Sequence, residues 1–426
     1  MKITALLCYG LLGLPLAMAA LPVYVQIPNY YTTQLGLPLA GTGLMLFFAR
    51  LIDTVQDPFL GKIVDKIRSD NPYWLVASGM LLCAAFYGLW LPPEYVRQQE
   101  FLLLLWLGLM LILAYTAHSM LNIAYLTWGA GLGTQATEIN LTGENPSLLG
   151  AAAWREGFGL IGVILASILP AWILQTPADQ RQDYLWQYSL GFGFILTASI
   201  WTLVGASPKP AHHMLQAKIH LQQILAAPIF RRLAIVYFFN SLSVAIPATL
   251  LLFFINDQIR TPEKTGLFLA GYFFAGACGL PLWIKFARKY TTRFAWQSSM
   301  LLAVCSFVGA AFLGAGDSTA FLFVCIVSGL VLGADLALPP VLLAESVADK
   351  SSLGSYYGVW SLIGKLSLAL AGLSLPLLHL LGFQSALQSS TNAIKDQSQL
   401  ALIITYALIP CLCKLIAFQL LRRSRS

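Results

Sequence analysis

The chain has 426 residues, of which 58% are hydrophobic and 10% are charged, and its formal net charge at pH 7 is +7. Soluble domains carry about 25% charged residues, so this composition excludes a string of soluble domains and predicts a membrane protein. A net positive charge can indicate nucleic-acid binding. Here the basic residues collect in loops on one side of the predicted membrane spans, which excludes that class.

Twelve apolar stretches follow in chain order, each long enough to cross a hydrocarbon core of about 30 Å. They cover residues 4–28, 36–61, 73–92, 101–128, 148–175, 185–206, 231–256, 265–286, 294–315, 319–344, 353–381 and 398–421. We expect an all-α membrane protein of twelve transmembrane helices, in which residues 1–207 form an N-terminal six-helix bundle that contains a cation site. A cytoplasmic linker at 208–230 then leads to a C-terminal six-helix bundle at 231–426.

The first stretch is similar to a signal peptide, because Lys2 precedes an apolar run that reaches Ala17-Met18-Ala19. The run continues to Ile27, and a second span follows at once. We therefore expect an uncleaved first helix.

Lysine and arginine are distributed unevenly over the two sides of a twelve-span arrangement. One side carries only Arg97, Arg181, Arg260, Lys264 and Lys395. The other carries Lys2, the cluster at 62–68, Lys209, Lys218, Arg231, Arg232, the cluster at 285–293, Lys350, Arg422, Arg423 and Arg425. Because cytoplasmic loops are enriched in these residues, we expect both termini in the cytoplasm and a location in a bacterial-type inner membrane.

The second stretch contains three charged residues, Arg50, Asp53 and Asp57. Their spacing of i, i+3 and i+7 places them on one side of a helix. A charge inside the bilayer is unfavourable unless it faces the bundle interior or a water-filled path, so such residues mark a functional site. At 1.5 Å per residue, Asp53 lies about 14 Å from Lys62, near the bilayer midplane where transporter sites lie.

The two acids of this stretch can hold a cation. Asp53 and Asp57 lie one turn apart and repel each other, so a hard cation such as Na⁺ bound between their oxygens would stabilise both. The alternative is that Arg50 neutralises them in an inert network. One arginine cannot cancel two acids, which favours the cation site.

One segment is repeated in the two halves. The sequence PFLGKIVDK at 58–66 aligns without gaps with PLWIKFARK at 281–289, and each ends the second span of its half. A six-plus-six repeat related by an axis along the membrane normal is the architecture of the major facilitator superfamily. Asp53 and Asp57 align with Gly276 and Leu280, so we expect the coupling chemistry in the N-terminal half.

The chain resembles the glycoside–pentoside–hexuronide:cation symporters, the melibiose-permease type within the major facilitator superfamily. The resemblance covers most of the chain and is carried most specifically by Ala49-Arg50, Asp53, Asp57-Pro58 and Gly61. It continues in Tyr9-Gly10, Tyr30-Tyr31-Thr32, Asn122-Ile-Ala-Tyr125, Arg155 and Lys365. It implies a Na⁺, Li⁺ or H⁺ site built from the two acids, with span four contributing and the span-eleven lysine nearby.

The chain departs from the family at the sugar site. Melibiose-type members have an aspartate where this chain has Asn122, a tryptophan where it has Leu126, and a sugar-binding aspartate where it has Ala17. We expect that the scaffold and the cation pair are kept while the galactoside pocket is largely lost. Since Arg155 and Lys365 remain, the preference should shift from neutral sugars toward an anionic or amphiphilic solute.

Span four carries two polar candidates on one face. Asn122 can offer a carbonyl oxygen to the cation, and His118 can carry a proton because an imidazole titrates near neutral pH. The alternative role of both is interhelical hydrogen bonding. Trp128 in the same span and Trp360 in span eleven are candidates for the solute pocket.

Charged residues in spans five and eleven need partners. Arg155 and Glu156 are adjacent, so we expect them to point about 100° apart and not to form a simple pair. Lys365 should pair with Asp53 or Asp57, or with a substrate anion.

The last spans carry structural candidates. Asp335 in span ten should form a structural pair with Lys414 in span twelve. The prolines Pro339 and Pro340 should break span ten and suggest a gating bend.

The sequence favours a secondary active symporter that moves Na⁺ or H⁺ together with a small polar or anionic solute such as a sugar, glycoside or uronide. The protein should act as a monomer in the lipid bilayer, with no cofactor and no nucleic-acid partner. Two alternatives stay open: a lysophospholipid or other amphiphile carrier on the same fold, and a non-transporting membrane sensor. The sequence contains no nucleophile–base pair, metal cluster or phosphate loop, which disfavours an enzyme.

Overall fold

The computed structural model describes residues 3–66, 72–132, 146–207, 221–347, 352–374, 377–378 and 399–423. Its contacts divide the chain into two compact units, each described here by itself. Unit one contains Met1–Ile139, Asn145–Leu221 and Ala348–Leu362, and unit two contains Asn140–Glu144, Gln222–Val347 and Ile363–Ser426.

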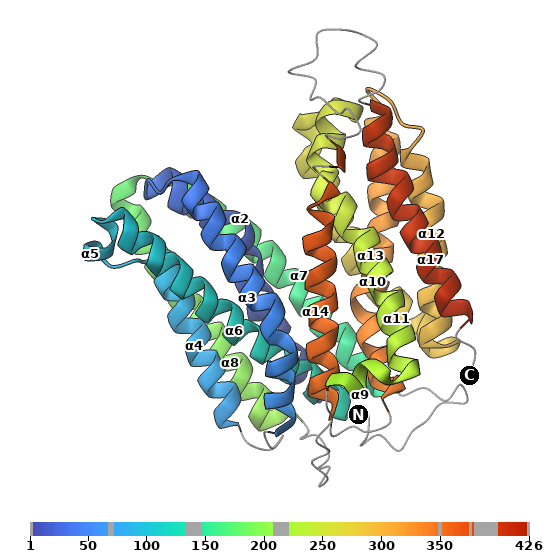
Figure 1. Cartoon of the computed structure of the whole chain (residues 1–426), viewed down its shortest axis with the longest axis horizontal. Helices are drawn as coiled ribbons and strands as arrows, with labels where there is room; N and C mark the ends of the chain where they lie inside the picture. Colours follow the sequence, from blue (N-terminus) through green and yellow to red (C-terminus); the bar gives the residue numbers. More distant parts are fainter. Residues whose placement is uncertain are drawn as a thin grey trace. The chain divides into compact units, whose positions relative to one another are not determined.

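Unit one is a bundle of long helices. In Figure 1, α3, α4, α6 and α8 run side by side in this unit, and α2 packs along α7. Its helices are α1 (Ile3–Gly10), α2 (Gly13–Asn29), the π-helical turn η1 (Tyr30–Gln34), α3 (Leu39–Lys66), α4 (Tyr73–Trp90), α5 (Glu94–Arg97), α6 (Glu100–Leu132), α7 (Pro146–Gln175) and α8 (Ala178–Ala206). Residues 353–362 of α14 (Leu353–Ala371) also belong to it.

Unit two is also a bundle of long helices. The most extensive contacts join α11 to α13, α12 to α13, and α10 to α17. Its helices are α9 (Leu221–Ala226), α10 (Pro228–Phe253), the π-helical turn η3 (Phe254–Ile259), the 3₁₀ turn η4 (Pro262–Lys264), α11 (Thr265–Lys289), α12 (Thr292–Ala310), α13 (Ser318–Ser346), the rest of α14, the π-helical turn η6 (Ile404–Leu408) and α17 (Ile409–Arg423).

Among the described residues, eight helices are long and apolar enough to cross a membrane. Helix α3 carries more charged residues than these eight helices, yet its exposed side chains include large apolar ones, as in a membrane-spanning helix. Phe47, Leu51 and Phe59 are exposed, whereas Asp53 and Asp57 are 4% and 0% exposed. A helix that turns its apolar side chains outward and its carboxylates inward is suited to lipid and not to water.

The first predicted span is broken, and the expectation of one continuous helix was wrong. α1 ends at Gly10 and α2 begins at Gly13. The cause is Pro15, which has no N–H for the carbonyl of Leu11 and whose ring crowds that carbonyl. At this place the backbone forms a hydrogen bond to the residue three positions earlier, from Leu14 N to Leu11 O at 3.1 Å.

The expected break in span ten was also wrong, because α13 continues through Pro339 and Pro340 to Ser346. Each proline removes one donor from the last turns of the helix. α13 packs extensively against α11 and α12.

The predicted linker 208–230 is only partly within the described residues. Residues 208–220 lie outside them, and the following segment is helical: α9 covers Leu221–Ala226, and α10 begins at Pro228. The seventh span therefore starts before residue 231, because proline is favoured in the first turn of a helix.

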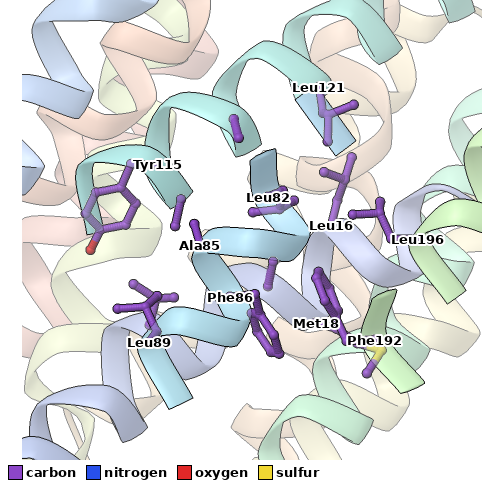
Figure 2. Packing of buried hydrophobic residues seen from close by; sticks show 14 of the residues in the cluster. Leu16, Met18, Leu82, Ala85, Phe86, Leu89, Tyr115, Leu121, Phe192 and Leu196 are labelled. Atoms are coloured by element: carbon purple, nitrogen blue, oxygen red, sulfur yellow. The ribbon is translucent and has the colours of Figure 1, made fainter. Parts of the chain in front are cut away.

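Each unit has its own apolar core. In unit one the core joins α2, α4, α6 and α8, and Figure 2 shows Phe86 of α4 beside Phe192 of α8, which stack with ring centroids 4.0 Å apart. In unit two, Phe254 of η3 stacks on Tyr406 of η6, also at 4.0 Å. Each core joins helices that are far apart in the sequence and so holds its bundle together.

Candidate functional site

The first acid of α3 lies in a network of hydroxyl and amide groups. Asp53 Oδ1 accepts hydrogen bonds from Ser119 Oγ of α6 at 3.1 Å and from Gln56 Nε2 at 3.3 Å. Thr116 of α6 donates to Gln56 Oε1 at 2.9 Å. The network therefore fixes α3 against α6 at the depth of Asp53.

The second acid contacts the middle of α14. Asp57 Oδ2 accepts a hydrogen bond from Ser361 Oγ at 2.5 Å. The two helices approach closely because glycines line their crossing: a Cβ atom on Gly358 would lie 2.5 Å from Asp57 O, and one on Gly61 would lie 2.3 Å from Gly354 O. A side chain at either glycine would push Ser361 away from the acid.

A third acid of α3 caps α14. Asp65 Oδ1 accepts from the backbone N–H of Gly354 at 2.6 Å, and its Oδ2 accepts from Ser355 N at 2.7 Å and from Ser355 Oγ. A carboxylate at this place satisfies the unpaired N–H groups of the first helical turn and complements the positive end of the helix dipole.

Asp53 and Asp57 together present a set of oxygen ligands. The carboxylates are buried, and the hydroxyls of Ser119 and Ser361 contact them directly. Hard cations prefer such oxygens. Among the described residues there is no group of three or more His, Cys, Asp or Glu that could hold a metal ion. The role of the two acids as a cation site stays a prediction.

The other candidates on α3 and α6 occupy the margins of this network. Arg50 is exposed and lies close enough to Tyr115 of α6 to interact with its hydroxyl. His118 contacts the backbone carbonyl of Leu16 in α2 at 3.1 Å. Asn122 is half-buried, and within the described part of the chain its side chain makes no hydrogen bond. Its role as a cation ligand stays a prediction.

Arg155 and Glu156 form an ion pair, which corrects the expectation that they would not. Arg155 Nε donates to Glu156 Oε1 at 2.7 Å, and a second guanidinium nitrogen lies 2.6 Å from the same oxygen. The two Cβ atoms do point apart on α7, but both side chains are long enough to bend toward each other above the helix surface. Arg155 also lies near the hydroxyls of Tyr9 and Tyr125.

Three further candidates lie on α6 and α14. Trp128 and Trp360 are buried, at 6% and 3% exposed, and Lys365 is half-buried in the part of α14 that belongs to unit two. The predicted pairing of Lys365 with Asp53 or Asp57 joins different units and stays a prediction.

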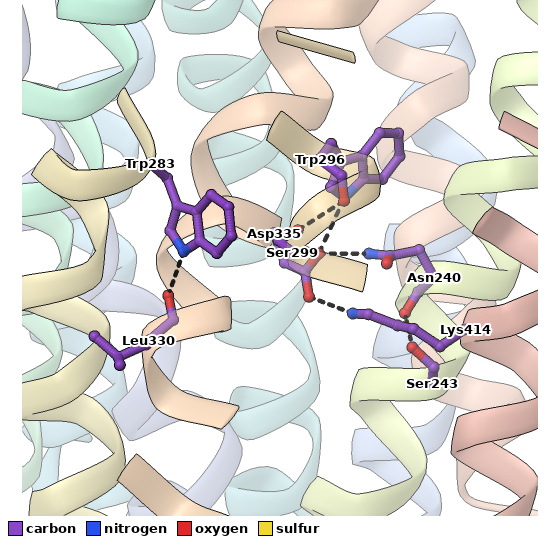
Figure 3. Close-up of polar contacts among 8 residues, drawn as sticks. All are labelled: Asn240, Ser243, Trp283, Trp296, Ser299, Leu330, Asp335 and Lys414. Carbon is purple, nitrogen blue, oxygen red and sulfur yellow. Dashed lines mark hydrogen bonds and ion pairs between the residues drawn. The ribbon is translucent and has the colours of Figure 1, made fainter. Parts of the chain in front are cut away.

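The predicted pair in unit two is confirmed. Lys414 Nζ of α17 lies 2.5 Å from Asp335 Oδ2 of α13. Figure 3 shows that the amide of Asn240 and the indole of Trp296 also reach this carboxylate.

In unit two, the helix that aligns with α3 is α11, and it contains no acid. Gly276 and Leu280 of α11 replace the two acids, and a Cβ atom on Gly279 would lie 2.4 Å from Leu330 O of α13. Trp283 of α11 donates to the same carbonyl at 2.8 Å (Figure 3). Where α3 carries its two acids, α11 therefore carries a glycine and a leucine.

Sequence reasoning missed Ser119, Gln56 and Ser361 as partners of the acids. Ser119 lies one turn before Asn122 on α6, so helical spacing from that candidate would have found it. Ser361 lies four residues before Lys365 on α14 and would have been found in the same way.

Comparisons with known proteins agree with this architecture. The family model described as MFS/sugar transport protein matches residues 7–425. The inner membrane symporter YicJ of Escherichia coli is 20% identical over 94% of this chain and 87% of its own length. The uncharacterized symporter YnaJ of Bacillus subtilis is 25% identical, but the match spans 40% of this chain and only 36% of that protein. The glucuronide carrier protein homolog of Escherichia coli is 24% identical over 29% of this chain and 26% of its own length.

Two solved structures share the fold. A bacterial homologue of the iron transporter ferroportin in its outward-facing state has a TM-score of 0.75 at 16% identity, with 99% of both chains covered. The fucose:proton symporter of Escherichia coli has a TM-score of 0.68 at 16% identity, with 99% of this chain and 98% of that chain covered. These likenesses confirm the predicted twelve-helix fold of two six-helix halves.

Proposed function

The chain belongs to the MFS/sugar transport protein family, and from that premise we propose that it is a cation-coupled symporter. As a member of this family it is a multi-pass membrane transporter of sugar-like solutes and not an enzyme. The proposal adds that Na⁺ or H⁺ moves with one small polar or anionic solute, by alternating access of the two halves.

The observation that carries the proposal is the burial of Asp53 and Asp57 on a helix with an apolar outer surface. Carboxylates at the middle of a membrane helix are unfavourable unless a cation, a proton or a fixed partner compensates them. The hydroxyls of Ser119 and Ser361 contact them and add oxygen atoms around the two carboxylates. We propose these acids as the coupling-cation site, with Asn122 as a further ligand and Arg50 and His118 at its margin.

The available energy suffices for accumulation. A pH gradient supplies about 1.4 kcal/mol per unit, and the membrane potential about 2.3 kcal/mol per charge per 100 mV. Either one therefore supports at least a tenfold solute gradient.

The solute is proposed to be a sugar derivative that carries negative charge. Arg155 supplies a partly buried guanidinium, and a carboxylate of the solute can replace its pairing with Glu156. One relative is a glucuronide carrier homolog, and a glucuronide is a sugar that carries a carboxylate. Lys365, Trp128 and Trp360 complete the proposed solute site.

We further propose that the protein lies in a bacterial inner membrane as a monomer with both termini in the cytoplasm. The distribution of lysine and arginine supports this orientation. An amphiphile carrier is the second candidate, supported by the replacement of the sugar-binding acids by Ala17 and Asn122.

Uptake into proteoliposomes tests the function. Purified protein is screened with labelled methyl glycosides, hexuronates, glucuronides and lysophospholipids, with and without an inward Na⁺ or H⁺ gradient. Symport predicts that one solute accumulates only with a gradient. An amphiphile carrier would move the lysophospholipid, and a sensor would bind a solute without moving any.

A further inference from the structure

The polar cluster around Asp335 lies wholly within unit two, whereas the proposed cation acids belong to unit one. Its four members come from four helices: Asn240 from α10, Trp296 from α12, Asp335 from α13 and Lys414 from α17. Asp335 Oδ2 accepts from Lys414 Nζ at 2.5 Å, and Oδ1 accepts from Trp296 Nε1 at 3.0 Å and from Asn240 Nδ2 at 3.2 Å. Figure 3 shows the side chains of Asn240, Trp296 and Lys414 reaching the carboxylate of Asp335.

The carboxylate of Asp335 is well supplied with donors. Three donors contact its two oxygens, and one of them is the ammonium group of Lys414. The unused donors and acceptors of the cluster belong to Asn240 and Lys414.

Asn240 leaves an acceptor unused. The residue is 2% exposed, and its Oδ1 atom has no hydrogen-bond partner in the described part of the chain. A buried amide oxygen without a donor is unfavourable by about 1–3 kcal/mol, and most such atoms in folded proteins are paired.

Lys414 leaves donors unused in the same cluster. An ammonium group has three N–H donors, and among the described residues Lys414 Nζ has the single acceptor Asp335 Oδ2. The residue is 4% exposed, so bulk water does not satisfy the others. Pro339 adds one more acceptor, because without an N–H it leaves the carbonyl of Asp335 without its usual helical donor.

We propose that this cluster is a binding site for one hydroxyl group, which donates to Asn240 Oδ1 and accepts from Lys414 Nζ. A hydroxyl is the group that can do both. An anion would be repelled by the carboxylate and the amide oxygen, and a cation would be repelled by the ammonium. The hydroxyl comes from a buried water molecule or from the transported solute.

The depth of the cluster suits either source. Asp335 lies eleven residues before the end of α13 at Ser346, which is about 17 Å along the helix axis. Lys414 lies nine residues before the end of α17 at Arg423, which is about 14 Å. Both are therefore near the middle of a membrane span, where transporters bind their solutes.

A structure of the full chain, at a resolution that shows buried waters, tests the site directly and without added solute. We expect a density peak about 2.7–3.2 Å from both Asn240 Oδ1 and Lys414 Nζ. Resolved waters elsewhere in the protein together with no peak at this place would overturn the proposal. This arm needs neither a gradient nor a known solute, so it can fail or succeed independently of the proposed symport.

A matched pair of variants attributes the peak to the cluster. Asn240→Leu removes the unused acceptor, and the peak should disappear. Ser299→Ala is the control, because the Ser299 hydroxyl donates to Trp296 O and, among the described residues, makes no hydrogen bond to Asn240 or Lys414. A peak that survives Asn240→Leu would show that something other than this acceptor holds it and would also overturn the proposal.

A second arm identifies the source and rests on the proposed solute transport. The probes are methyl β-D-glucuronide and its monodeoxy analogues. If the solute supplies the hydroxyl, one monodeoxy analogue should bind the wild type at least tenfold more weakly than methyl β-D-glucuronide does. Methyl β-D-glucuronide should in turn bind Asn240→Leu at least tenfold more weakly than it binds the wild type. If the peak persists beside bound solute and all analogues bind alike, the hydroxyl belongs to water. The proposal stands in both cases.

Discussion

Ser361 of α14 donates a 2.5 Å hydrogen bond to Asp57 of α3, across 304 positions of the chain. The bond is possible because Gly61 and Gly358 let the two helices cross with their backbones almost in contact. Asp65, also on α3, accepts hydrogen bonds from the backbone N–H groups in the first turn of α14. The position of α14 against the proposed cation site thus depends on both small and acidic residues.

Replacing Gly61 should loosen this crossing. The new Cβ atom of Gly61→Ala would lie 2.3 Å from Gly354 O, so a backbone must shift. Overpacking of this kind destabilises proteins by about 1–3 kcal/mol, which thermal unfolding in detergent would detect as a lower Tm. Gly43→Ala on the same helix is the control, because its Cβ atom meets nothing within 4 Å. Equal Tm values for the two variants would contradict the close crossing.

The ion pair of Arg155 gives a prediction about the solute. Arg155→Gln should weaken binding of an anionic solute tens-fold or more, because loss of one partner of a desolvated charge contact has an effect of roughly 2–5 kcal/mol. Glu156→Gln is the matched variant, and it should keep or strengthen anion binding because it leaves the guanidinium in place. Calorimetry on purified protein measures both. Unchanged affinity in Arg155→Gln, with a neutral galactoside bound as well as any anion, would contradict the role.

Lys414→Met should strongly destabilise unit two. The variant leaves Asp335 buried without its cation, and breaking a buried pair from one side destabilises by about 3–5 kcal/mol. The double variant with Asp335→Leu removes both charges and should recover much of the loss. A double-mutant cycle of thermal unfolding measures the coupling, and additive effects would mean that the pair does not interact.

The orientation in the membrane can be tested by reporter fusions. Fusions after Arg68, His213 and Arg293 should be cytoplasmic, and those after Arg97 and Lys264 should be periplasmic, because lysine and arginine favour cytoplasmic loops. Arg68 and His213 lie outside the described residues. The reverse pattern would refute the predicted orientation.

Hydropathy predicted the helices well because bilayer thickness determines how long an apolar span must be. The span predicted at 101–128 is α6 at Glu100–Leu132, and the pairing of Asp335 with Lys414 was also predicted. Local features of the helices were harder to predict from the sequence. The effect of Pro15 on the first span was overlooked, and the pair of Arg155 and Glu156 depends on side-chain length more than on helical direction.

The serine hydroxyls that contact the two acids could not be predicted from the sequence, for a different reason. Serines are common on membrane helices and carry no charge to reveal a role. The contact of Ser361 with Asp57 arises from the packing of α14 on α3, which a periodic pattern in either helix does not encode. Charged candidates could therefore be named from the sequence, and their neutral partners required the fold.

The coupling role of the acids is the central claim. Asp53→Asn and Asp57→Asn each keep the shape of the side chain and remove its charge, so the cation should no longer bind. Each variant should lose gradient-driven accumulation and keep some downhill exchange. Asp179→Asn is the control, because this acid is exposed in the first turn of α8.

The most direct measurement is uptake of the solute found in the screen into proteoliposomes, under an inward Na⁺ or H⁺ gradient, for the wild type and these three variants. Symport through the acids predicts accumulation in the wild type and in Asp179→Asn. It predicts simple equilibration, with exchange retained, in Asp53→Asn and Asp57→Asn. Full uphill accumulation in both of the latter variants would contradict the role of these acids in coupling.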